Sequence, residues 1–275
     1  MGLYLVATPI GNLGDITLRA LAVLARADVV YCEDTRHSRT LLAHFAIDRP
    51  LRPYHEHNAD AERPRVLAEL GRGRVVALIS DAGTPLISDP GFKLVRDAIA
   101  SGHHVTCLPG ASSVTSAVAI AGLPTDRFHF AGFLPTRESQ RASRLSELAA
   151  IPATLVLFEA PNRLAATLAD IAAVLGGDRD IAVVRELTKR FEEVRRGKAT
   201  EVAAWAEAEP PRGEIVIVVG PPVEREATDA DIEAALTELL PAASLKEAAK
   251  AVASRLGVPR SRAYDLGLRL KGRAS

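Results

Sequence analysis

The chain has 275 residues, enough for about two domains, and 48% of them are hydrophobic and 25% charged, which excludes a broadly disordered protein. Lysine plus arginine and aspartate plus glutamate each number 34, which excludes a globally basic coat for nucleic acid. Aromatic residues make up only 4%, so the chain has few side chains on which single-stranded bases could stack.

Short apolar runs alternate with amphipathic segments along the chain up to residue 219. Strands between helices of this length predict βαβ units and a mostly parallel sheet that is covered on both faces. The expected strands are 3–7, 29–32, 74–79, 104–108, 128–134, 154–158, 181–184 and 215–219. The expected helices are 17–27, 38–45, 61–71, 92–100, 112–121, 138–149, 162–175 and 202–207.

Two interruptions divide this pattern. Gly122 and Pro124 precede a phenylalanine-rich strand, and Pro221 and Pro222 end the last one, so we expect domains at 1–121 and 122–224. From Thr228 the pattern becomes helical, which predicts a third unit at 228–275.

The third unit is basic. Residues 241–275 hold eight lysines and arginines against two acids, a net charge of +6, so the rest of the chain carries −6. A capping box from Ser244 to Glu247 starts one helix, Gly257 stops it, and a second helix follows, which predicts a helix-turn-helix or a plain helical hairpin. The charge predicts a polyanionic partner or a solvated helix face, and both readings stay open.

No apolar run approaches the roughly 20 residues that span a bilayer, and the N-terminus lacks a signal-peptide pattern, so we expect a cytoplasmic protein with no membrane partner. Cys32 and Cys107 lie in separate apolar runs without a neighbouring Cys/His cluster, and His55 and His57 have no third ligand at a recognisable spacing. We therefore expect neither a disulfide framework nor a metal site.

Three junctions between a strand and a loop are rich in glycine and proline: residues 7–15, 79–91 and 108–113. Such bends expose main-chain groups at the carboxyl ends of parallel strands, where open α/β sheets bind ligands. The serines that follow Gly110 suit a helix N-cap or a helix start that receives a carboxylate. Neither the dinucleotide motif G-x-G-x-x-G nor the P-loop motif occurs.

Together, LYLVATPIGNLGDIT (3–17), YCEDTRHSRTLL (31–42), ALISDAGTPLISDPG (77–91) and CLPGASSVTSAVAIAGLP (107–124) resemble the RsmI methyltransferases, a branch of the tetrapyrrole-methylase fold. The resemblance continues through FHFAGFLP, LVLFEAPNRL, VVRELTKRFEEVRRG and GEIVIVVG into the C-terminal helices. It implies S-adenosylmethionine-dependent methylation of the ribose 2′-hydroxyl of cytidine 1402 in 16S rRNA of the small ribosomal subunit. It also implies a homodimer and two α/β domains with the cofactor cleft between them, followed by the small C-terminal helical unit.

The resemblance also suggests which residues contact the methyl donor. Thr84 stands where the wider fold has the acid of Gly-Asp-Pro, which leaves open the acid that touches the donor, with Asp81 as the candidate. The expected donor contacts are Pro9, Asp81, Ala82, Gly83, Ile87, Ser88, Ala111, Ser112, Ser113, Phe133, Leu187 and Glu214.

The reaction needs a base or an oxyanion-stabilising group beside the hydroxyl. Glu33 and Asp34 at a strand end, and Lys189 in the second half, are the expected catalytic residues, and a helix-cap role for the acids stays open. The alternative candidates are His55, His57, Glu159, Glu186 and Glu214. RNA affinity should come from phosphate contacts. The expected RNA contacts are Arg36, Arg39, Arg163, Arg185, Lys246, Arg260 and Arg262, while Arg195 and Arg196 bind RNA or are merely solvated.

Two other functions remain open from sequence. One keeps the fold and methylates a tetrapyrrole-like small molecule, although such an enzyme has no evident need for the basic C-terminal unit. The other is an RNA-binding assembly factor without catalysis, which the three intact junctions disfavour.

Overall fold

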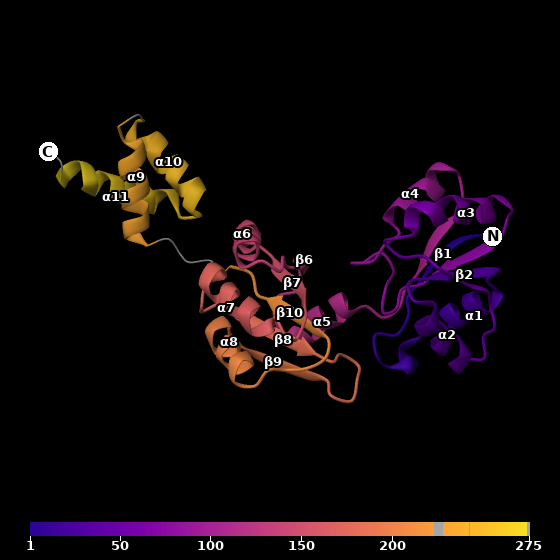
Figure 1. Cartoon of the computed structure of the whole chain (residues 1–275). Coiled ribbons are helices and arrows are strands. Elements are labelled where there is room, and N and C mark those ends of the chain that lie inside the picture. Colours follow the sequence, from indigo (N-terminus) through magenta and orange to yellow (C-terminus); the bar gives the residue numbers. More distant parts are fainter. Residues whose placement is uncertain (223–227, 242, 274–275) are drawn as a thin grey trace. The chain divides into compact units, whose positions relative to one another are not determined.

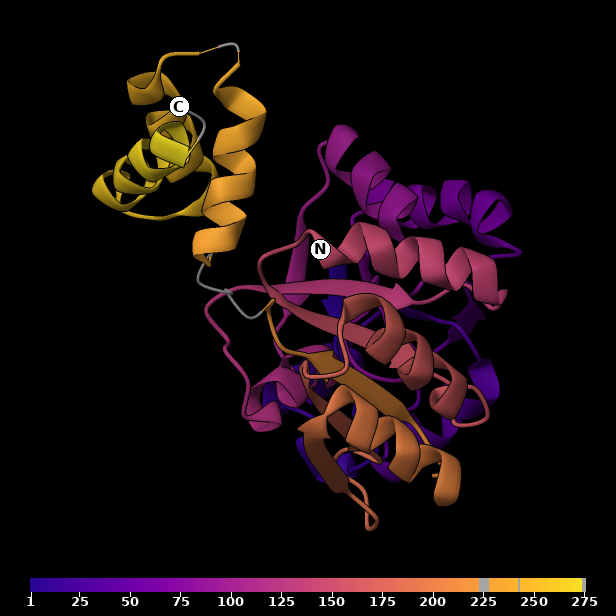
Figure 2. The same ribbon diagram turned by 90° about the vertical axis from the view of Figure 1, so that its left-hand side faces the viewer.

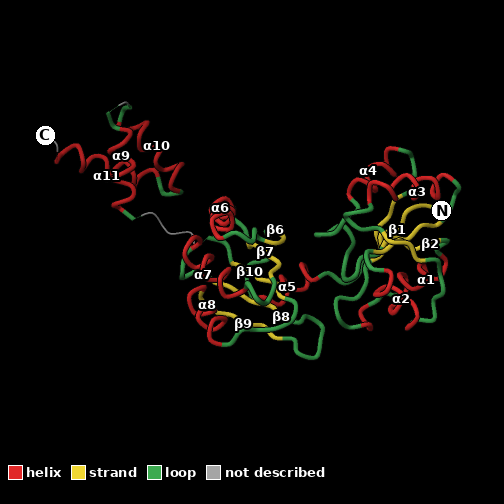
Figure 3. The backbone as a smooth tube through the Cα atoms, in the orientation of Figure 1, coloured by secondary structure: helices red, strands yellow, loops and turns green. Residues whose placement is uncertain are grey.

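The computed structural model describes residues 1–222, 228–241 and 243–273. The chain divides into two compact units, Met1–Pro222 and Val223–Ser275. The first unit contains two five-stranded sheets with helices packed on them (Figures 1 and 3). None of the described helices is long and apolar enough to cross a membrane.

The first sheet is parallel throughout, as expected, in the order β3-β2-β4-β1-β5. Parallel neighbours require crossover connections, and helices supply them. The strands are β1 (Gly2–Val6), β2 (Val29–Cys32), β3 (Leu51–Pro53), β4 (Val75–Leu78) and β5 (Val105–Leu108). The helices are α1 (Leu18–Arg26), α2 (Thr35–His44), α3 (Ala59–Gly71) and α4 (Phe92–Ala100), and the short helix η1 (Leu13–Asp15) precedes α1.

Alternating strand residues bury the two faces of this sheet. Leu3 and Val76 pack in one cluster with residues of α3 and α4. Val6 and Ala77 point the other way, into a cluster with residues of α1 and α2. Because all the strands run the same way, the loops that follow β1, β2, β4 and β5 leave the sheet at the same edge.

The second sheet departs from the expected parallel arrangement. Its order is β6-β7-β10-β8-β9, and only the β6–β7 pair is parallel. The loop 186–192 reverses the chain between β8 and β9 without a helix, and β10 inserts between β7 and β8. The strands are β6 (Phe128–Phe133), β7 (Thr154–Glu159), β8 (Asp180–Arg185), β9 (Glu193–Lys198) and β10 (Ile215–Val219).

Helices cover both faces of the second sheet. On one face lie α6 (Glu138–Ala149), α7 (Leu164–Leu175) and α8 (Ala199–Ala208). On the other lies α5 (Ser113–Ala121), whose Val114 and Val118 pack against Val184 and Val216. A helix that precedes the expected boundary at 121/122 therefore packs on the second sheet, and the division of residues 1–222 at that point stays a prediction.

The sequence missed two edge strands. β3 is only three residues long and contains Pro53, and β9 carries Glu193, Arg195, Arg196 and Lys198, so neither shows an apolar run. Helix α2 begins at Thr35, three residues before the expected start at residue 38. Asp34 caps it by accepting a hydrogen bond from the Arg36 amide at 2.8 Å.

The second unit consists of α9 (Asp229–Leu239), α10 (Leu245–Leu256) and α11 (Arg260–Arg273) in its described residues (Figure 2, orange to yellow). Ile232, Leu236, Val252 and Leu266 form its core. The expected capping box joins Ser244 and Glu247 at the start of α10, and Gly257 ends that helix in the left-handed conformation.

Candidate functional site

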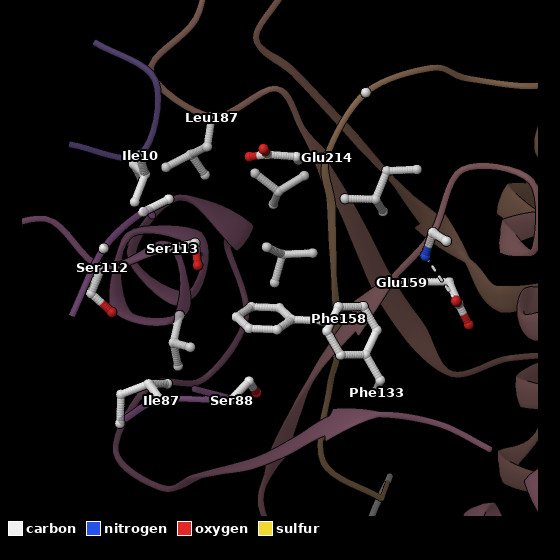
Figure 4. Close-up of a pocket in the computed structure, with 18 of the residues that line it drawn as sticks. Ile10, Ile87, Ser88, Ser112, Ser113, Phe133, Phe158, Glu159, Leu187 and Glu214 are labelled. Atoms are coloured by element: carbon white, nitrogen blue, oxygen red, sulfur yellow. Dashed lines mark hydrogen bonds between the residues drawn. The ribbon is translucent and has the colours of Figure 1, made fainter. Parts of the chain in front are cut away.

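A cavity of about 410 Å³ lies in the first unit between loops of the first sheet and strands of the second (Figure 4). Its volume falls within the range of small-molecule sites. Nine of the expected donor contacts line it: Ala82, Gly83, Ile87, Ser88, Ser112, Ser113, Phe133, Leu187 and Glu214. Their contact with a donor stays a prediction.

Hydrogen bonds join the three glycine- and proline-rich junctions at the cavity. Thr8 and Gly83 exchange backbone hydrogen bonds of 2.9 and 3.0 Å, which couples the loops after β1 and β4. The Thr84 hydroxyl donates to the carbonyl of Ala111 at 3.2 Å, which couples the loops after β4 and β5. The junctions that sequence singled out therefore form one wall.

Backbone conformations that are rare for side chains gather in this region. Gly83 has φ +77°, and a Cβ there would lie 3.2 Å from Cγ2 of Ile10. The other residues are not glycine: Leu86 and Ser88 in the loop after β4, and Glu186 and Thr188 in the loop after β8, also have positive φ. Such strain clusters at binding and catalytic sites because the surrounding structure must enforce it.

The N-terminus of α5 faces the cavity. Ser112 occupies the N-cap position but makes no side-chain cap hydrogen bond, so the backbone donors of the first turn are not taken by it. Ser112 and Ser113 both line the cavity (Figure 4). Backbone donors and the helix dipole make such a helix start suited to a carboxylate.

The opposite wall is mainly apolar. Phe133 and Phe158 meet edge to face with their centroids 5.5 Å apart, and Val184 and Val216 of neighbouring strands lie beside them. Figure 4 shows the two rings on the side of the cavity away from Ser112. Phe133 is 58% exposed despite its size, which leaves ring surface available to a flat apolar group.

Glu159 lines the cavity, but its carboxylate is fully engaged. The Thr167 hydroxyl donates to Oε2 at 2.6 Å, and the Ala160 amide and the Arg163 guanidinium approach Oε1 at 2.8 and 3.3 Å. Arg163 also donates to the carbonyls of Leu134 and Pro135. This pair therefore fixes the backbone beneath the apolar wall.

The loop after β8 holds a second set of charges. Nζ of Lys189 lies 2.9 Å from Oε1 of Glu186 and 3.1 Å from Oε2 of Glu214. Hydrogen bonds from the Glu214 amide and then from the Lys189 side chain lower the pKa of Glu186. Lys189 thus orients Glu214 at the cavity, while Gly11 of the first half leaves room for the lysine stem.

Three expected donor contacts do not line the cavity. Pro9 is buried, Ala111 accepts the Thr84 hydrogen bond, and Oδ1 of Asp81 accepts the Asp34 amide at 3.0 Å. Asp81 therefore anchors the loop that follows β2 through the Asp34 amide. Its contact with the donor stays a prediction.

None of the expected catalytic residues lies on the cavity wall. Asp34 pairs with Arg36 at 3.0 Å, and hydrogen bonds from that side chain and its amide lower the pKa of Asp34 to about 2. Burial and the charge of Asp81 raise the pKa of Glu33. Lys189 reaches the cavity through Glu214, and all three catalytic roles stay predictions.

Asp89 lines the cavity although it is not among the expected donor contacts. Burial, followed by the Glu33 charge, raises the pKa of Asp89 to about 6, and a Ser80 hydrogen bond partly offsets this. The signal in the sequence is its place in the glycine- and proline-rich residues 79–91, where Asp81 or Asp89 could orient a hydroxyl or attract a cation. Ile10, Thr84 and Phe158 were missed in the same way and also line the cavity.

The expected RNA contacts fall into two classes. Some arginines are engaged in ion pairs: Arg163 with Glu159, Arg185 with Glu193 at 3.0 Å, and Arg262 with Asp229 at 2.7 Å. Arg36 is 90% exposed beyond its pair with Asp34, and Arg39, Lys246 and Arg260 are exposed. Arg39, Lys246 and Arg260 can reach phosphates without breaking an ion pair, so these three are the stronger predictions, whereas Arg36 would first have to leave Asp34.

Arg196, left open between RNA and solvent, has a structural partner. It donates from β9 to the carbonyls of Ile120 and Ala121 at the end of α5. Arg195 instead lies over the Trp205 ring, 5.4 Å from its centroid. Within the described ranges, no group of three or more His, Cys, Asp or Glu residues has the geometry of a metal site.

The first unit matches a known family over most of its length. The family Tetrapyrrole (Corrin/Porphyrin) Methylases covers residues 2–203, and the chain belongs to it. Uroporphyrin-III-C-methyltransferase from Thermus thermophilus shares the fold, with TM-score 0.58 and 24% identity over 79% of this chain and 93% of that one. Diphthine synthase does so with TM-score 0.62 and 16% identity over 79% of this chain and 89% of that one.

Full-length relatives place the chain within that family. It is 50% identical to "Ribosomal RNA small subunit methyltransferase I" of Mesorhizobium japonicum, over 98% of this chain and 92% of the relative. It is 45% identical to the protein of that name in Pseudomonas aeruginosa, over 99% of this chain and 98% of the relative. Residues 226–271 match the RsmI C-terminal HTH domain, so the RsmI resemblance and the helix-turn-helix reading are confirmed.

Proposed function

We propose that the chain transfers a methyl group from S-adenosylmethionine to the ribose 2′-hydroxyl of cytidine 1402 in 16S rRNA. The observation that carries this proposal is full-length similarity, in both body and C-terminal unit, to relatives named as ribosomal RNA small subunit methyltransferases. The similarity spans the loops that form the cavity, so the proposed site belongs to the shared part of the chain.

The residues at the cavity fit the donor. Backbone donors at the start of α5 suit its carboxylate, and the wall around Phe133 and Phe158 suits its adenine ring. Glu159 and Glu214 place carboxylates at a cavity that would hold a positively charged sulfur. Gly83 leaves space that a Cβ would fill. We propose the nine expected contacts that line the cavity as its binding residues.

The chain's own contribution is mainly placement. S-adenosylmethionine, when bound, supplies a methyl group on a sulfonium that reacts with an oxygen approaching opposite the sulfur. Coupled loops that hold both partners in line supply much of the rate, since well-oriented reactants reach effective molarities worth about 7–11 kcal/mol. The hydrogen bonds of Thr8 and Thr84 fix these loops to one another.

RNA is held, in this proposal, by exposed basic residues on both units. Arg36 and Arg39 lie on α2, directly after the β2 strand end, and Lys246 and Arg260 lie on the C-terminal helices. Such contacts bind phosphates and make the affinity for RNA fall as the salt concentration rises.

We further propose a homodimer. Phe92 and Ile99, 70% and 60% exposed and seven residues apart on α4, give such contact an apolar surface.

The test is a methylation assay with the purified full chain. Ribosomal 30S subunits and naked 16S rRNA that lack the modification are incubated with S-adenosylmethionine, and the rRNA is mapped by mass spectrometry. We expect one added methyl group, on the ribose of cytidine 1402. Methylation of a uroporphyrin-like tetrapyrrole without rRNA methylation would favour the alternative suggested by the fold neighbours, and absence of donor binding in calorimetry would contradict both.

A further inference from the structure

Three carboxylates line the cavity, and their surroundings differ. Glu159 is 3% exposed, and both of its oxygens accept hydrogen bonds. The side chain of Glu214 is 73% exposed and paired with Lys189. Asp89 has no cationic partner in the part of the chain that the structure describes. It is therefore the carboxylate at the cavity that is free to take a proton from a ligand.

The groups facing Asp89 are acidic. The charges of Glu33 at the end of β2 and of Asp81 in the loop after β4 both raise the pKa of Asp89, and the charges of Asp34 and His55 act in turn on Glu33. Glu159 and Glu214 line the same cavity from the second sheet. Like charges close to a carboxylate favour its protonated form, so Glu33 and Asp81 both strengthen Asp89 as a base.

Resting on the proposed function, we propose that Asp89 is the general base that accepts the proton of the RNA hydroxyl, and that Glu33 acts through it as a positioning residue. The geometry points to Asp89 because, of the described carboxylates on the cavity wall, it is the one that is not held by a cation.

The step balances in atoms and electrons. Asp89 takes the hydroxyl proton while the oxygen forms its bond to the methyl carbon, and the electron pair of the broken carbon–sulfur bond stays on sulfur. A neutral carboxylic acid, a methyl ether and a neutral thioether result. Since the pKa of Asp89 lies at about 6, the carboxylate is ionised at neutral pH and still more basic than an ordinary aspartate.

The experiment compares the full-length wild type with Asp89→Asn and Glu33→Gln. Single-turnover methyl transfer to 30S subunits or rRNA is measured from pH 5 to 9, and affinity for S-adenosylmethionine by calorimetry. We expect Asp89→Asn to lower the rate about 10²–10⁴-fold, the usual contribution of a general base, with donor affinity within about twofold of wild type. The matched control is Asp126→Asn, an exposed aspartate outside the cavity, which should keep the wild-type rate.

The pH profile tests the link to Glu33. The wild-type rate should rise as Asp89 ionises near pH 6, and Asp89→Asn should lose this rise. Removing the negative charge of Glu33 lowers the pKa of Asp89, so Glu33→Gln should move the rise to lower pH, which a merely structural residue would not do.

Each contrary result has its own meaning. A wild-type rate in Asp89→Asn, or a more than tenfold loss of donor affinity in it, overturns the role of Asp89 while leaving the proposed function intact. An unmoved profile in Glu33→Gln overturns the role of Glu33. A wild-type chain that methylates no rRNA hydroxyl overturns the proposed function and this proposal with it.

Discussion

The cavity wall from the first sheet is made of loops, whereas the wall from the second sheet is made largely of strand side chains. Gly83, Ser88 and Ser112 offer small groups and main chain on the first side. Phe133, Phe158 and Val216 offer apolar surface on the second. The parallel sheet sends its loops to one edge, which gathers polar groups there, while the mixed sheet turns a strand face toward the ligand.

Charge is handled differently on the two walls. On the second wall, Glu159 and Glu214 are neutralised by Arg163 and Lys189. On the first wall, Asp89 is left among other carboxylates. Paired charges fix a structure, whereas an unpaired one is available for chemistry, so the second wall is expected to govern stability and the first to govern binding and catalysis.

The largest effect on stability should come from the second wall. Arg163→Leu leaves the buried Glu159 carboxylate without its cation and should lower the free energy of unfolding by about 3 kcal/mol. Urea titration measures this, with Arg127→Leu, an exposed arginine, as the control. Unchanged stability together with weaker RNA binding would instead make Arg163 an RNA contact.

On the first wall, Gly83→Ala should weaken binding of S-adenosylmethionine about tenfold. The new Cβ would lie 3.2 Å from Cγ2 of Ile10, which also lines the cavity, so it would take space from the donor, and a tenfold loss corresponds to about 1.4 kcal/mol. Gly102→Ala has nearly the same φ, +74°, with no atom within 4 Å of the new Cβ. Calorimetry on both variants separates the cavity from backbone strain, since an equal loss in both would contradict the assignment.

Removing the hydrogen bonds by which Arg196 joins α5 to the second sheet should lower the stability of the protein moderately. Arg196→Ala removes the charged donors to the last carbonyls of α5 and should cost about 1.5 kcal/mol of stability. Arg195→Ala, its neighbour on β9, loses only a contact with Trp205 worth about 0.5–1 kcal/mol. If thermal melts rank these two variants the other way, Arg196 does not anchor α5.

The unpaired charge of Asp89 should also appear in stability. Its pKa is raised in the folded state, so its favourable contribution is present below about pH 4 and is lost as the pH rises through about 6. The side chain introduced by Asp89→Asn cannot ionise, so the free energy of unfolding of the variant relative to wild type should be higher at pH 8 than at pH 4. We expect this difference to be about 1 kcal/mol, because solvent screens part of the effect. Melting curves at the two pH values measure the difference, and equal gains would contradict it.

The smallest expected effects lie in the second unit. Lys246→Ala and Arg260→Ala should each weaken RNA binding modestly and reduce the slope of log affinity against log salt by about 0.7–0.9, one phosphate contact. Arg255→Ala, whose side chain pairs with Glu238 at 3.1 Å, should change the slope less. Filter binding with 16S rRNA at several salt concentrations measures these slopes. Unchanged slopes in all three variants would remove this surface from the RNA interface.

Much of the fold and the site was predictable. Apolar runs located every strand with a buried face, and the glycines and prolines of 79–91 marked the loop that holds Gly83 and Ser88. The edge strands β3 and β9 were missed because half-exposed polar strands carry no apolar run. The antiparallel pairing of β10 was missed because composition does not specify which strand a strand will join.

The sequence by itself determined the alternation of strands and helices, the capped helices of the basic unit and the bends that expose main chain, because these depend on local periodicity and on the torsional limits of glycine and proline. The tertiary structure decided which charges are paired. Arg163 and Arg196 bind groups up to 76 residues away, while Asp89 is left among acids. A charge acts through its neighbours in space, and folding alone brings them together.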